Sequence, residues 1–528
     1  MSRNRLAALV PVVVAFACVP PEVTRAALSD SAQQASTTSC VPNPGKVDVL
    51  LVIDDSASMG EESEALATNL ANFMFVYEIP AAALDYRIAV TTTSVAGAQC
   101  TDSPEGGALL ATPCTQRLDD FVTSDSHESP ALDLRHVCHD RCSLASLPIT
   151  PTAVVGDTGP ERPRPWLERH VGQHNYPDDV DPAELLACMG QVGVAGCVYE
   201  SPLEAARLAL ARMQDPQDPA FGFMRDDAAL FVMFIGDEGD CSVRQAHADL
   251  FAPDGDTSLW ATDEPTSAIC WRAGVSCEGG PEEFDDCRAE TIGRDGRPGS
   301  AADAVLTPVD EYLDVLAAID AYKQRRSGVD TPRVFVSAAA GGTIGDGAVF
   351  KNGINPAFKA AFGIGPGCNT SSATGYPPSR IAEVVTAFGE RDAVATLTCN
   401  SDWSSALACV PGGWPPTSFG KACVSVCAAD TDPSTPTVEP DCRLVETRGA
   451  ESRDIPPCLT TGADSWAYPE GADVCVQWLT GDDIHPNCSE AGSNVSWFVQ
   501  REGPLWDGWC TEVTCTVSMF PEYDCPDL

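Results

Sequence analysis

The chain has 528 residues, of which 44% are hydrophobic, and carries 76 Asp and Glu against 32 Lys and Arg, a formal net charge of −44. This length predicts about two to four domains, and the hydrophobic fraction excludes a wholly disordered chain. The charge excludes a general nucleic-acid binder and disfavours docking on anionic lipid, because both need basic surface. The 24 cysteines, spread over the whole length, predict an oxidising compartment and a disulfide framework.

The first 18 residues predict an export signal, with a basic start, an apolar stretch and a small-x-small cleavage pattern at Ala15-Phe16-Ala17. Cys18 follows directly and is a candidate for lipid attachment; plain secretion, with Cys18 a bystander, is the alternative. Residues 19–44 are rich in Pro, Ser, Thr and Gln and predict a tether. We therefore expect a protein at the outer surface, in the cell envelope or secreted, that touches the membrane only through such a lipid.

Strand and helix patterns alternate between about residues 45 and 411. Runs of branched apolar residues predict buried strands at 47–53, 86–92, 231–235, 334–340 and 394–398. Apolar residues at helical spacing predict helices at about 58–77, 201–213, 307–323, 379–388 and 403–409. Ser58 and Glu61 form a capping box at the first of these, and Ser201 is the expected N-cap of the second. This alternation predicts a doubly wound α/β domain with a mostly parallel sheet.

Three stretches lack this periodicity. Residues of about 95–190 and 239–305 hold many Cys, Pro, Asp and Gly, and we expect disulfide-stapled insertions there. Residues 412–528 hold nine Cys and five Trp beyond the one at 414, which predicts a small, loop-rich module held by disulfides. A glycan or peptide platform is one interpretation of these tryptophans, and the core of the module is the more ordinary one.

Two acidic loops follow predicted strands of the α/β domain. Asp54, Ser56 and Ser58 come directly after the first strand, and Asp237 follows the third. Ligands bind such sheets at the carboxyl ends of the strands, so we expect these side chains to face a common point. Two carboxylates and two hydroxyls are hard oxygen ligands, which suit Mg²⁺, Mn²⁺ or Ca²⁺ rather than zinc. Plain helix capping is the alternative role of Asp54 and Ser58.

At these residues the chain resembles the von Willebrand factor type A family. The metal-ion-dependent adhesion site of that family begins with Asp-x-Ser-x-Ser after a hydrophobic strand, which Asp54 to Ser58 matches, and Asp237 matches its distal Asp. The order of strands and helices over about 45–411 is also similar to the family, interrupted by the two insertions. The chain looks closest to exported bacterial members with a Gly-Cys-x-x-Glu stretch, here Gly196–Glu200, and an Asp-Glu-x-Asp-Cys-Ser stretch, here Asp237–Ser242.

One position departs from this family. Its members usually supply a Thr from the loop before the helix that precedes the distal-Asp strand, and Val194 stands at that place here. Ser201, Glu200 or an extra water are the possible substitutes. Glu238 and Asp240 are candidates for additional ligands or for support of the site, and solvated loop charges are the alternative.

Three cysteine arrangements carry expectations. Cys197 and Cys241 lie in the two loops that should approach one another, so we expect them to bond and brace the site. Cys368 and Cys399 both lie near the last strand, and we expect a second bond there. Cys138-His139-x-x-Cys142 resembles a zinc-binding sequence, but disulfides are favoured in an exported chain rich in cysteine.

The resemblance implies ligand binding and no enzymatic activity. The protein would supply part of the coordination shell, water the rest, and a carboxylate of a protein or surface polymer would displace one water. No Gly-x-Ser-x-Gly, His-Glu-x-x-His or Gly-x-x-x-x-Gly-Lys-Ser/Thr sequence occurs, and a phosphatase of the haloacid dehalogenase type would need Asp where Ser56 stands. The alternatives are a structural envelope protein with a degenerate metal site and, more distantly, a hydrolase that uses the acidic loops.

Overall fold

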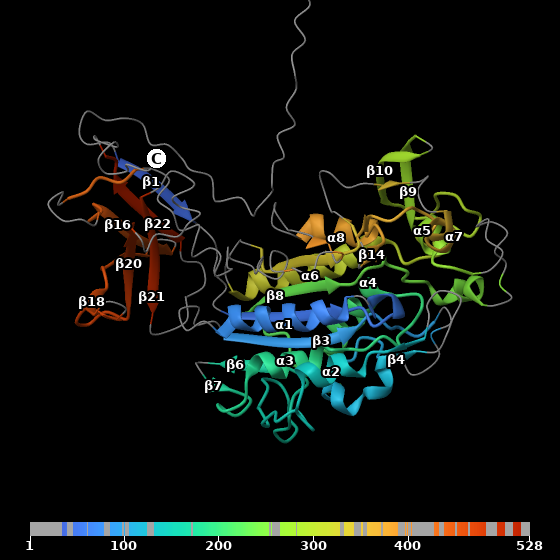
Figure 1. Ribbon diagram of the computed structural model, residues 1–528, viewed down its shortest axis with the longest axis horizontal. Helices are drawn as coiled ribbons and strands as arrows, with labels where there is room; N and C mark the ends of the chain where they lie inside the picture. Colours follow the sequence, from blue (N-terminus) through green and yellow to red (C-terminus); the bar gives the residue numbers. More distant parts are fainter. Residues whose placement is uncertain are drawn as a thin grey trace, which may run out of the picture.

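The structure, a computed structural model, consists of an α/β domain and a module of antiparallel strands that stands apart from it (Figure 1). The residues that it describes are 34–39, 46–60, 62–78, 85–97, 100, 105–123, 131–170, 173–252, 255, 265–280, 282–327, 332–342, 350–351, 356–370, 373–388, 396–397, 399, 403, 427–431, 438–448, 451–462, 465–481, 494–501 and 510–518. The structural statements below concern these residues.

A seven-stranded sheet forms the centre of the α/β domain, in the order β15-β11-β8-β2-β3-β6-β7. The five strands from β15 to β3 are paired in parallel. Strand β6 pairs antiparallel with β3, and β7 pairs antiparallel with β6. The sheet is therefore mixed and mostly parallel, as predicted. Its strands are β2 (Lys46–Ile53), β3 (Asp85–Thr92), β6 (Leu167–His170), β7 (Gln173–His174), β8 (Ala229–Ile235), β11 (Val334–Ala340) and β15 (Thr396–Leu397).

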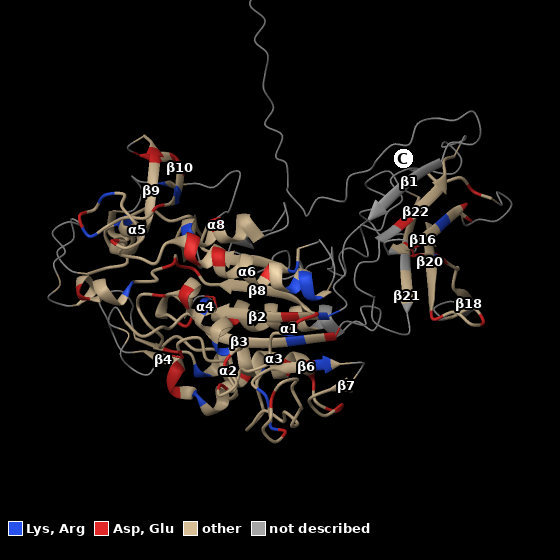
Figure 2. Ribbon diagram, turned by 180° about the vertical axis from the view of Figure 1, so that it is seen from behind, with Lys and Arg blue, Asp and Glu red and all other residues tan. Residues whose placement is uncertain are grey.

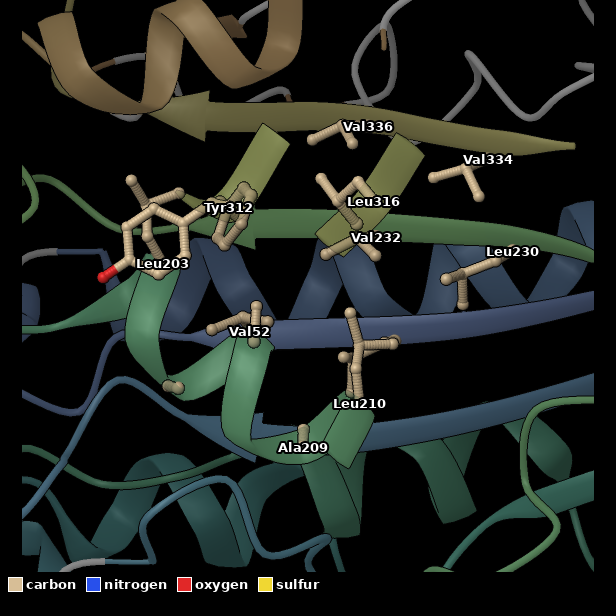
Figure 3. Packing of buried hydrophobic residues seen from close by; sticks show 14 of the residues in the cluster. Val52, Leu203, Ala209, Leu210, Leu230, Val232, Tyr312, Leu316, Val334 and Val336 are labelled. Atoms are coloured by element: carbon tan, nitrogen blue, oxygen red, sulfur yellow. The ribbon is translucent and has the colours of Figure 1, made fainter. Parts of the chain in front are cut away.

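Helices contribute to apolar clusters on both faces of this sheet. Side chains of a strand point alternately to its two faces, and in β2 the odd-numbered residues from Val47 to Ile53 join one cluster while Leu50 and Val52 join the other. In the second cluster, side chains such as Leu210 and Leu316 meet the sheet (Figure 3). The first cluster contains α1 (Ser63–Glu78) and α3 (Pro182–Gly190), and the second contains α4 (Pro202–Arg212), α6 (Val309–Ser327) and α8 (Ser379–Phe388).

The stretch 95–190 is more than the stapled insertion that its sequence predicts. Strand β6 pairs with β3 and widens the central sheet, and α3 contributes to the same core cluster as α1. The Asp181 carboxylate accepts a hydrogen bond from the Ala183 amide at 2.9 Å and so caps α3. These elements were missed because four strand residues and nine helix residues are too short to give a clear period. The stretch also holds β4 (Val122–Thr123), β5 (Leu132–Asp133) and α2 (Arg135–Arg141).

Disulfides hold both Cys-bearing stretches. Cys138 bonds to Cys114 and Cys142 to Cys188, so both cysteines of the zinc-like sequence lie in disulfides.

The stretch 239–305 contains one α-helix and two strands, which are α5 (Ala268–Gly274), β9 (Val275–Gly279) and β10 (Glu283–Ala289). The segment between β11 and α8 adds β12 (Phe350–Lys351), α7 (Pro356–Phe362), β13 (Cys368–Asn369) and β14 (Thr374–Gly375).

The C-terminal module is built from antiparallel strands, not mainly from loops as expected. Its strands are held together by backbone hydrogen bonds between neighbouring strands and by the Cys442–Cys515 and Cys458–Cys475 disulfides. Trp478 lies opposite Trp497 in the pairing of β20 with β21, and both pack against the core of the module, which supports the core interpretation for these two tryptophans. The strands are β16 (Cys442–Arg448), β17 (Glu451–Ile455), β18 (Leu459–Gly462), β19 (Ser465–Ala467), β20 (Val474–Thr480), β21 (Val495–Arg501) and β22 (Cys510–Thr516).

Part of the predicted tether belongs to this module. Strand β1 (Gln34–Ser39) pairs antiparallel with β22, so the tether prediction for 19–44 is wrong at these six residues. The composition suggested a linker because Ser and Thr are polar. Thr also favours strands, however, and backbone pairing needs no apolar side chain. Cys18, the signal predicted for 1–18 and the helical turn predicted after Trp403 lie outside the described residues. Among the described helices, none is long and apolar enough to cross a membrane.

Candidate functional site

The four predicted metal ligands meet where β2 and β8 end. Ser58 Oγ donates a hydrogen bond to Asp237 Oδ1 at 3.1 Å, and Ser56 Oγ and Ser58 Oγ are 2.8 Å apart. The Ser56 amide donates to Asp54 Oδ1 at 2.9 Å. The pairing of β2 with β8 ends with Ile53 opposite Ile235, so the two loops leave the sheet side by side. Two carboxylates and two hydroxyls from positions about 180 residues apart thus share one site.

The Ser58 hydroxyl does not cap a helix, because no α-helix starts at Ser58. A short 3-10 turn, Ala57–Gly60, follows the strand, and α1 begins only at Ser63. The capping-box prediction at Ser58 is therefore wrong, and its other member, Glu61, lies outside the described residues. The Ser58 hydroxyl bonds to Ser56 and Asp237 instead.

Asp54 is packed tightly against the second loop. Its amide donates to the Ile235 carbonyl at 2.8 Å, and a Cβ added at Gly236 would lie 2.8 Å from Asp54 Oδ2. Burial raises the pKa of Asp54 to about 6, while hydrogen bonds from Ser56 and Thr93 act in the opposite direction. A cation bound at this carboxylate would offset the cost of burying its charge.

Asp55 is held by residues that follow β3. Ser94 Oγ lies 2.9 and 3.0 Å from the two Asp55 carboxylate oxygens, and Thr93 Oγ1 donates to one of them at 3.3 Å. Gly196 covers this carboxylate so closely that a Cβ there would lie 2.3 Å from Asp55 Cγ. Burial, followed by the charges of Glu105 and Asp54, raises the pKa of Asp55 to about 8.

Glu200 is buried near Asp54. It is 3% exposed, and its Oε1 makes no hydrogen bond within the described part of the chain. Together with Asp54, Thr93 and Glu238 it lines a small pocket at the ends of the strands. Burial raises the pKa of Glu200 well above its usual value, and the charges of Glu238 and Asp54 raise it further.

Asp240 supports the site and is not aimed at the four ligands. Its Oδ1 accepts a hydrogen bond from the Leu203 amide at 3.1 Å, in the first turn of α4, and its Oδ2 accepts one from Arg380 Nε at 2.9 Å. Ser242 Oγ lies 3.2 Å from the Glu204 amide, which donates to it. The loop of Asp237 therefore caps α4 from a distance and is tied to α8.

Ser201 occupies the N-cap position of α4, as predicted, but its hydroxyl does not cap the helix. Its side chain makes no capping hydrogen bond, and its Oγ donates to the Cys241 carbonyl at 3.0 Å. The amides of Leu203 and Glu204, in the first turn of the helix, donate instead to Asp240 and Ser242. Val194, at the place of the family's Thr, is buried and offers no hydroxyl.

The predicted Cys197–Cys241 disulfide is wrong. Cys197 bonds to Cys100, and Cys241 bonds to Cys270. The two loops do meet, since the Cys241 amide donates to the Glu200 carbonyl at 2.8 Å, but their cysteines bond to other partners. Each loop is thus tied to a different part of the domain. The predicted bond between Cys368 and Cys399 is present.

Sequence reasoning missed Thr93, Ser94 and Arg380. Thr93 and Ser94 directly follow β3, the next strand along the edge, so the strand-end rule that selected Asp54 could have found them too. Arg380 had no such signal. Within the described residues, no group of three or more His, Cys, Asp or Glu side chains is arranged to hold a metal ion, so any cation here depends on the serine hydroxyls as well.

Comparisons with known proteins add little to this geometry. No protein-family model matches the chain, and no curated protein matches it. One similar solved structure is the open conformation of the pilus adhesin SpaC from Lactobacillus rhamnosus GG, with a TM-score of 0.28 and 8% identity over 93% of this chain and 41% of that chain. A second structure of that adhesin gives a TM-score of 0.25 and 8% identity, over 93% and 42%. This chain thus spans less than half the length of the adhesin, and a likeness of this size carries no information on function.

Proposed function

We propose that residues 45–411 form a doubly wound domain of the von Willebrand factor type A kind, and that the protein binds a partner at the cell surface through a divalent cation. The cation would be Mg²⁺, Mn²⁺ or Ca²⁺, held by Asp54, Ser56, Ser58 and Asp237. The observation that carries this proposal is the hydrogen-bonded chain from Ser56 through Ser58 to Asp237, which joins two strand ends.

The donor set fits such an ion. Carboxylate and hydroxyl oxygens are the ligands that hard cations prefer, and about six or more positions must be filled. The hydroxyls now donate to one another and to Asp237, and turning their lone pairs to a cation needs only rotation about their C–O bonds. Positions that the protein leaves open are where a partner's oxygen would bind, and the sequence predicts a carboxylate for it.

Export of the protein and its place at the cell surface belong to the same proposal. Cys197 and Cys241, in two loops near the candidate site, form disulfides, as does the pair Cys368 and Cys399, and such bonds persist in oxidising compartments. The acidic composition keeps the protein soluble and concentrates cations around it. Attachment through a lipid on Cys18 remains part of this proposal.

Metal calorimetry on the full chain tests the site. Asp54→Ala should bind neither Mg²⁺, Mn²⁺ nor Ca²⁺ measurably, and Ser56→Ala should bind at least about tenfold more weakly than wild type, because each removes an oxygen ligand. Asp249→Ala, which removes an exposed carboxylate paired with Arg294, should bind as wild type. Equal metal binding in wild type, Asp54→Ala and Ser56→Ala would remove the proposal.

Gly236→Ala gives a test that leaves all four ligands in place. The added Cβ would lie 2.8 Å from Asp54 Oδ2 and 2.9 Å from Asp54 Cβ, so the carboxylate must move. We expect metal affinity to fall about tenfold, as when a ligand loses its support. Gly280→Ala is the matched control, because Gly280 is exposed and its added Cβ would have only the Glu283 carbonyl at 3.5 Å. Calorimetry that finds the two variants alike would contradict this packing argument.

A structural envelope protein with a degenerate site is the competing function. It predicts that attachment of the protein to its own cell surface is the same with and without EDTA. The proposed function predicts that attachment is lost in EDTA, is restored by excess Mg²⁺ or Ca²⁺, and is absent for Asp54→Ala.

A further inference from the structure

We infer that Tyr376 is a positioning residue of the proposed cation site: its backbone amide holds Asp237, and its buried ring holds the same loop at Gly239. The inference rests on the proposed function. It also assigns part of the second insertion, 239–305, to the support of the site.

The backbone of Tyr376 is joined to the loop that carries Asp237. The Tyr376 amide donates a hydrogen bond to the Asp237 carbonyl at 2.7 Å. Gly341, directly after β11, lies close to both. A Cβ added there would be 2.2 Å from the Asp237 carbonyl oxygen and 2.2 Å from the Tyr376 nitrogen. Only glycine therefore allows this close approach of three backbone segments.

The ring of Tyr376 occupies the place that a side chain at Gly239 would take. A Cβ added at Gly239 would lie 2.1 Å from Tyr376 Cε1 and 2.7 Å from Cδ1, and its three nearest atoms all belong to this ring. Gly239 does not have a left-handed backbone conformation, so the ring, and not the backbone, excludes a side chain there. Tyr376 is 6% exposed, and a ring packed on all sides has little room to move.

Two aromatic side chains hold the Tyr376 ring in turn. The centre of the Trp271 ring lies 5.5 Å from that of Tyr376 with the planes at 88°, and the centre of the Phe362 ring lies 5.6 Å away with the planes at 54°. Buried rings favour such edge-to-face and tilted contacts. Trp271 belongs to α5, and Cys270 beside it is bonded to Cys241, which follows the loop 237–240. The loop and α5 are thus joined twice, once by this disulfide and once through the Tyr376 ring.

An uncharged support suits this loop, because Asp237, Glu238 and Asp240 are all acidic. Like charges repel one another, and Asp and Glu are also spread over helices and loops of the α/β domain (Figure 2). Burial raises the pKa of Tyr376 well above its usual value, and the charge of Glu238 raises it further, so the phenol stays neutral. The ring therefore fixes the loop without adding to the repulsion.

Size variants at the two positions test the role of the ring. Calorimetry on the full chain uses the cation among Mg²⁺, Mn²⁺ and Ca²⁺ that wild type binds most tightly. Tyr376→Phe keeps the ring and should bind as wild type, whereas Tyr376→Ala and Gly239→Ala should each bind about tenfold more weakly, as when a ligand loses its support. Phe223→Ala removes a buried ring that contacts Trp166, and it should bind the cation as wild type does.

The double variant Gly239→Ala/Tyr376→Ala separates positioning from a general loss of stability. If the methyl group at 239 acts only by displacing the ring, it has no further effect once the ring is absent, so the double variant should bind like Tyr376→Ala alone. Two independent effects would instead multiply to a loss of about a hundredfold. Circular dichroism checks that each variant is folded, and Tyr376→Val takes the place of Tyr376→Ala if the latter unfolds.

Three results overturn the inference: wild-type affinity in the folded Tyr376→Ala or Tyr376→Val variant, a loss in Tyr376→Phe as large as in that variant, or multiplying losses in the double variant. A wild type that binds none of the three cations overturns the proposed function, and the inference with it.

Discussion

Replacing Asp240 by Ala should lower the free energy of unfolding of the α/β domain by about 3–5 kcal/mol. The Asp240 and Arg380 side chains are 0% and 3% exposed, and their oxygen and nitrogen lie 2.9 Å apart. Removing the carboxylate leaves a buried guanidinium without its charge partner. The same change uncaps α4, because the Leu203 amide loses its acceptor. Urea titration with the disulfides intact, followed by tryptophan fluorescence, measures this loss.

Asp249→Ala is the control for this prediction. Asp249 pairs with Arg294 in the same domain, but the two side chains are 58% and 41% exposed. Water screens such a pair, so the variant should unfold at the wild-type urea concentration. If Asp240→Ala and Asp249→Ala unfold at the same concentration, the buried pair does not hold the loop of Asp237 in place.

Removing the Cys100–Cys197 disulfide should have the second largest effect. The bond closes a segment of 97 residues, shortened by the Cys114–Cys138 and Cys142–Cys188 bonds inside it. In the chain-entropy account, the double variant Cys100→Ser/Cys197→Ser should lose about 2–4 kcal/mol of stability. It should also bind the proposed cation more weakly, because Cys197 directly follows the glycine that packs on Asp55.

The disulfide between β9 and β10 offers a matched control, because its removal also replaces two cysteines. Cys277→Ser/Cys287→Ser opens a bond that closes only 10 residues, so its loss of stability should be smaller and its metal affinity unchanged. Urea titration and calorimetry on both double variants give the two readouts. A larger effect at the hairpin, or wild-type metal affinity in Cys100→Ser/Cys197→Ser, would show that this disulfide does not brace the site.

These variants test one physical feature of the candidate site, which is that hydrogen bonds from neighbouring elements fix the positions of its loops. Ser94 holds the Asp55 carboxylate, and Arg380 and the first turn of α4 hold Asp240. Oxygens fixed in this way need little reordering when a cation binds, and such preorganisation increases affinity without new contacts. The polar residues around Asp54 and Asp237 are thus explained as supports for the two short loops that carry the candidate ligands.

Much of the α/β domain could be predicted from local pattern. Residues 47–53 and 231–235 are continuous apolar runs because both faces of the central strands are covered, and they are β2 and the end of β8 in the structure. The same pattern failed for β6 and α3, whose periods are too short, and for β1, whose composition is that of a linker.

The sequence by itself determined the central strands and helices and which loops carry the candidate site, because hydrophobic period and strand-end position are local properties of a chain. Only the tertiary structure decided which side chains from distant parts of the chain meet around this site. Asp240 and Arg380 are 140 residues apart, and Cys197 turns to Cys100 although the loop of Cys241 lies beside it. Such partners depend on side-chain direction and packing in space. For the same reason, the buried Glu200 oxygen that makes no hydrogen bond within the described residues could be recognised only in the folded chain.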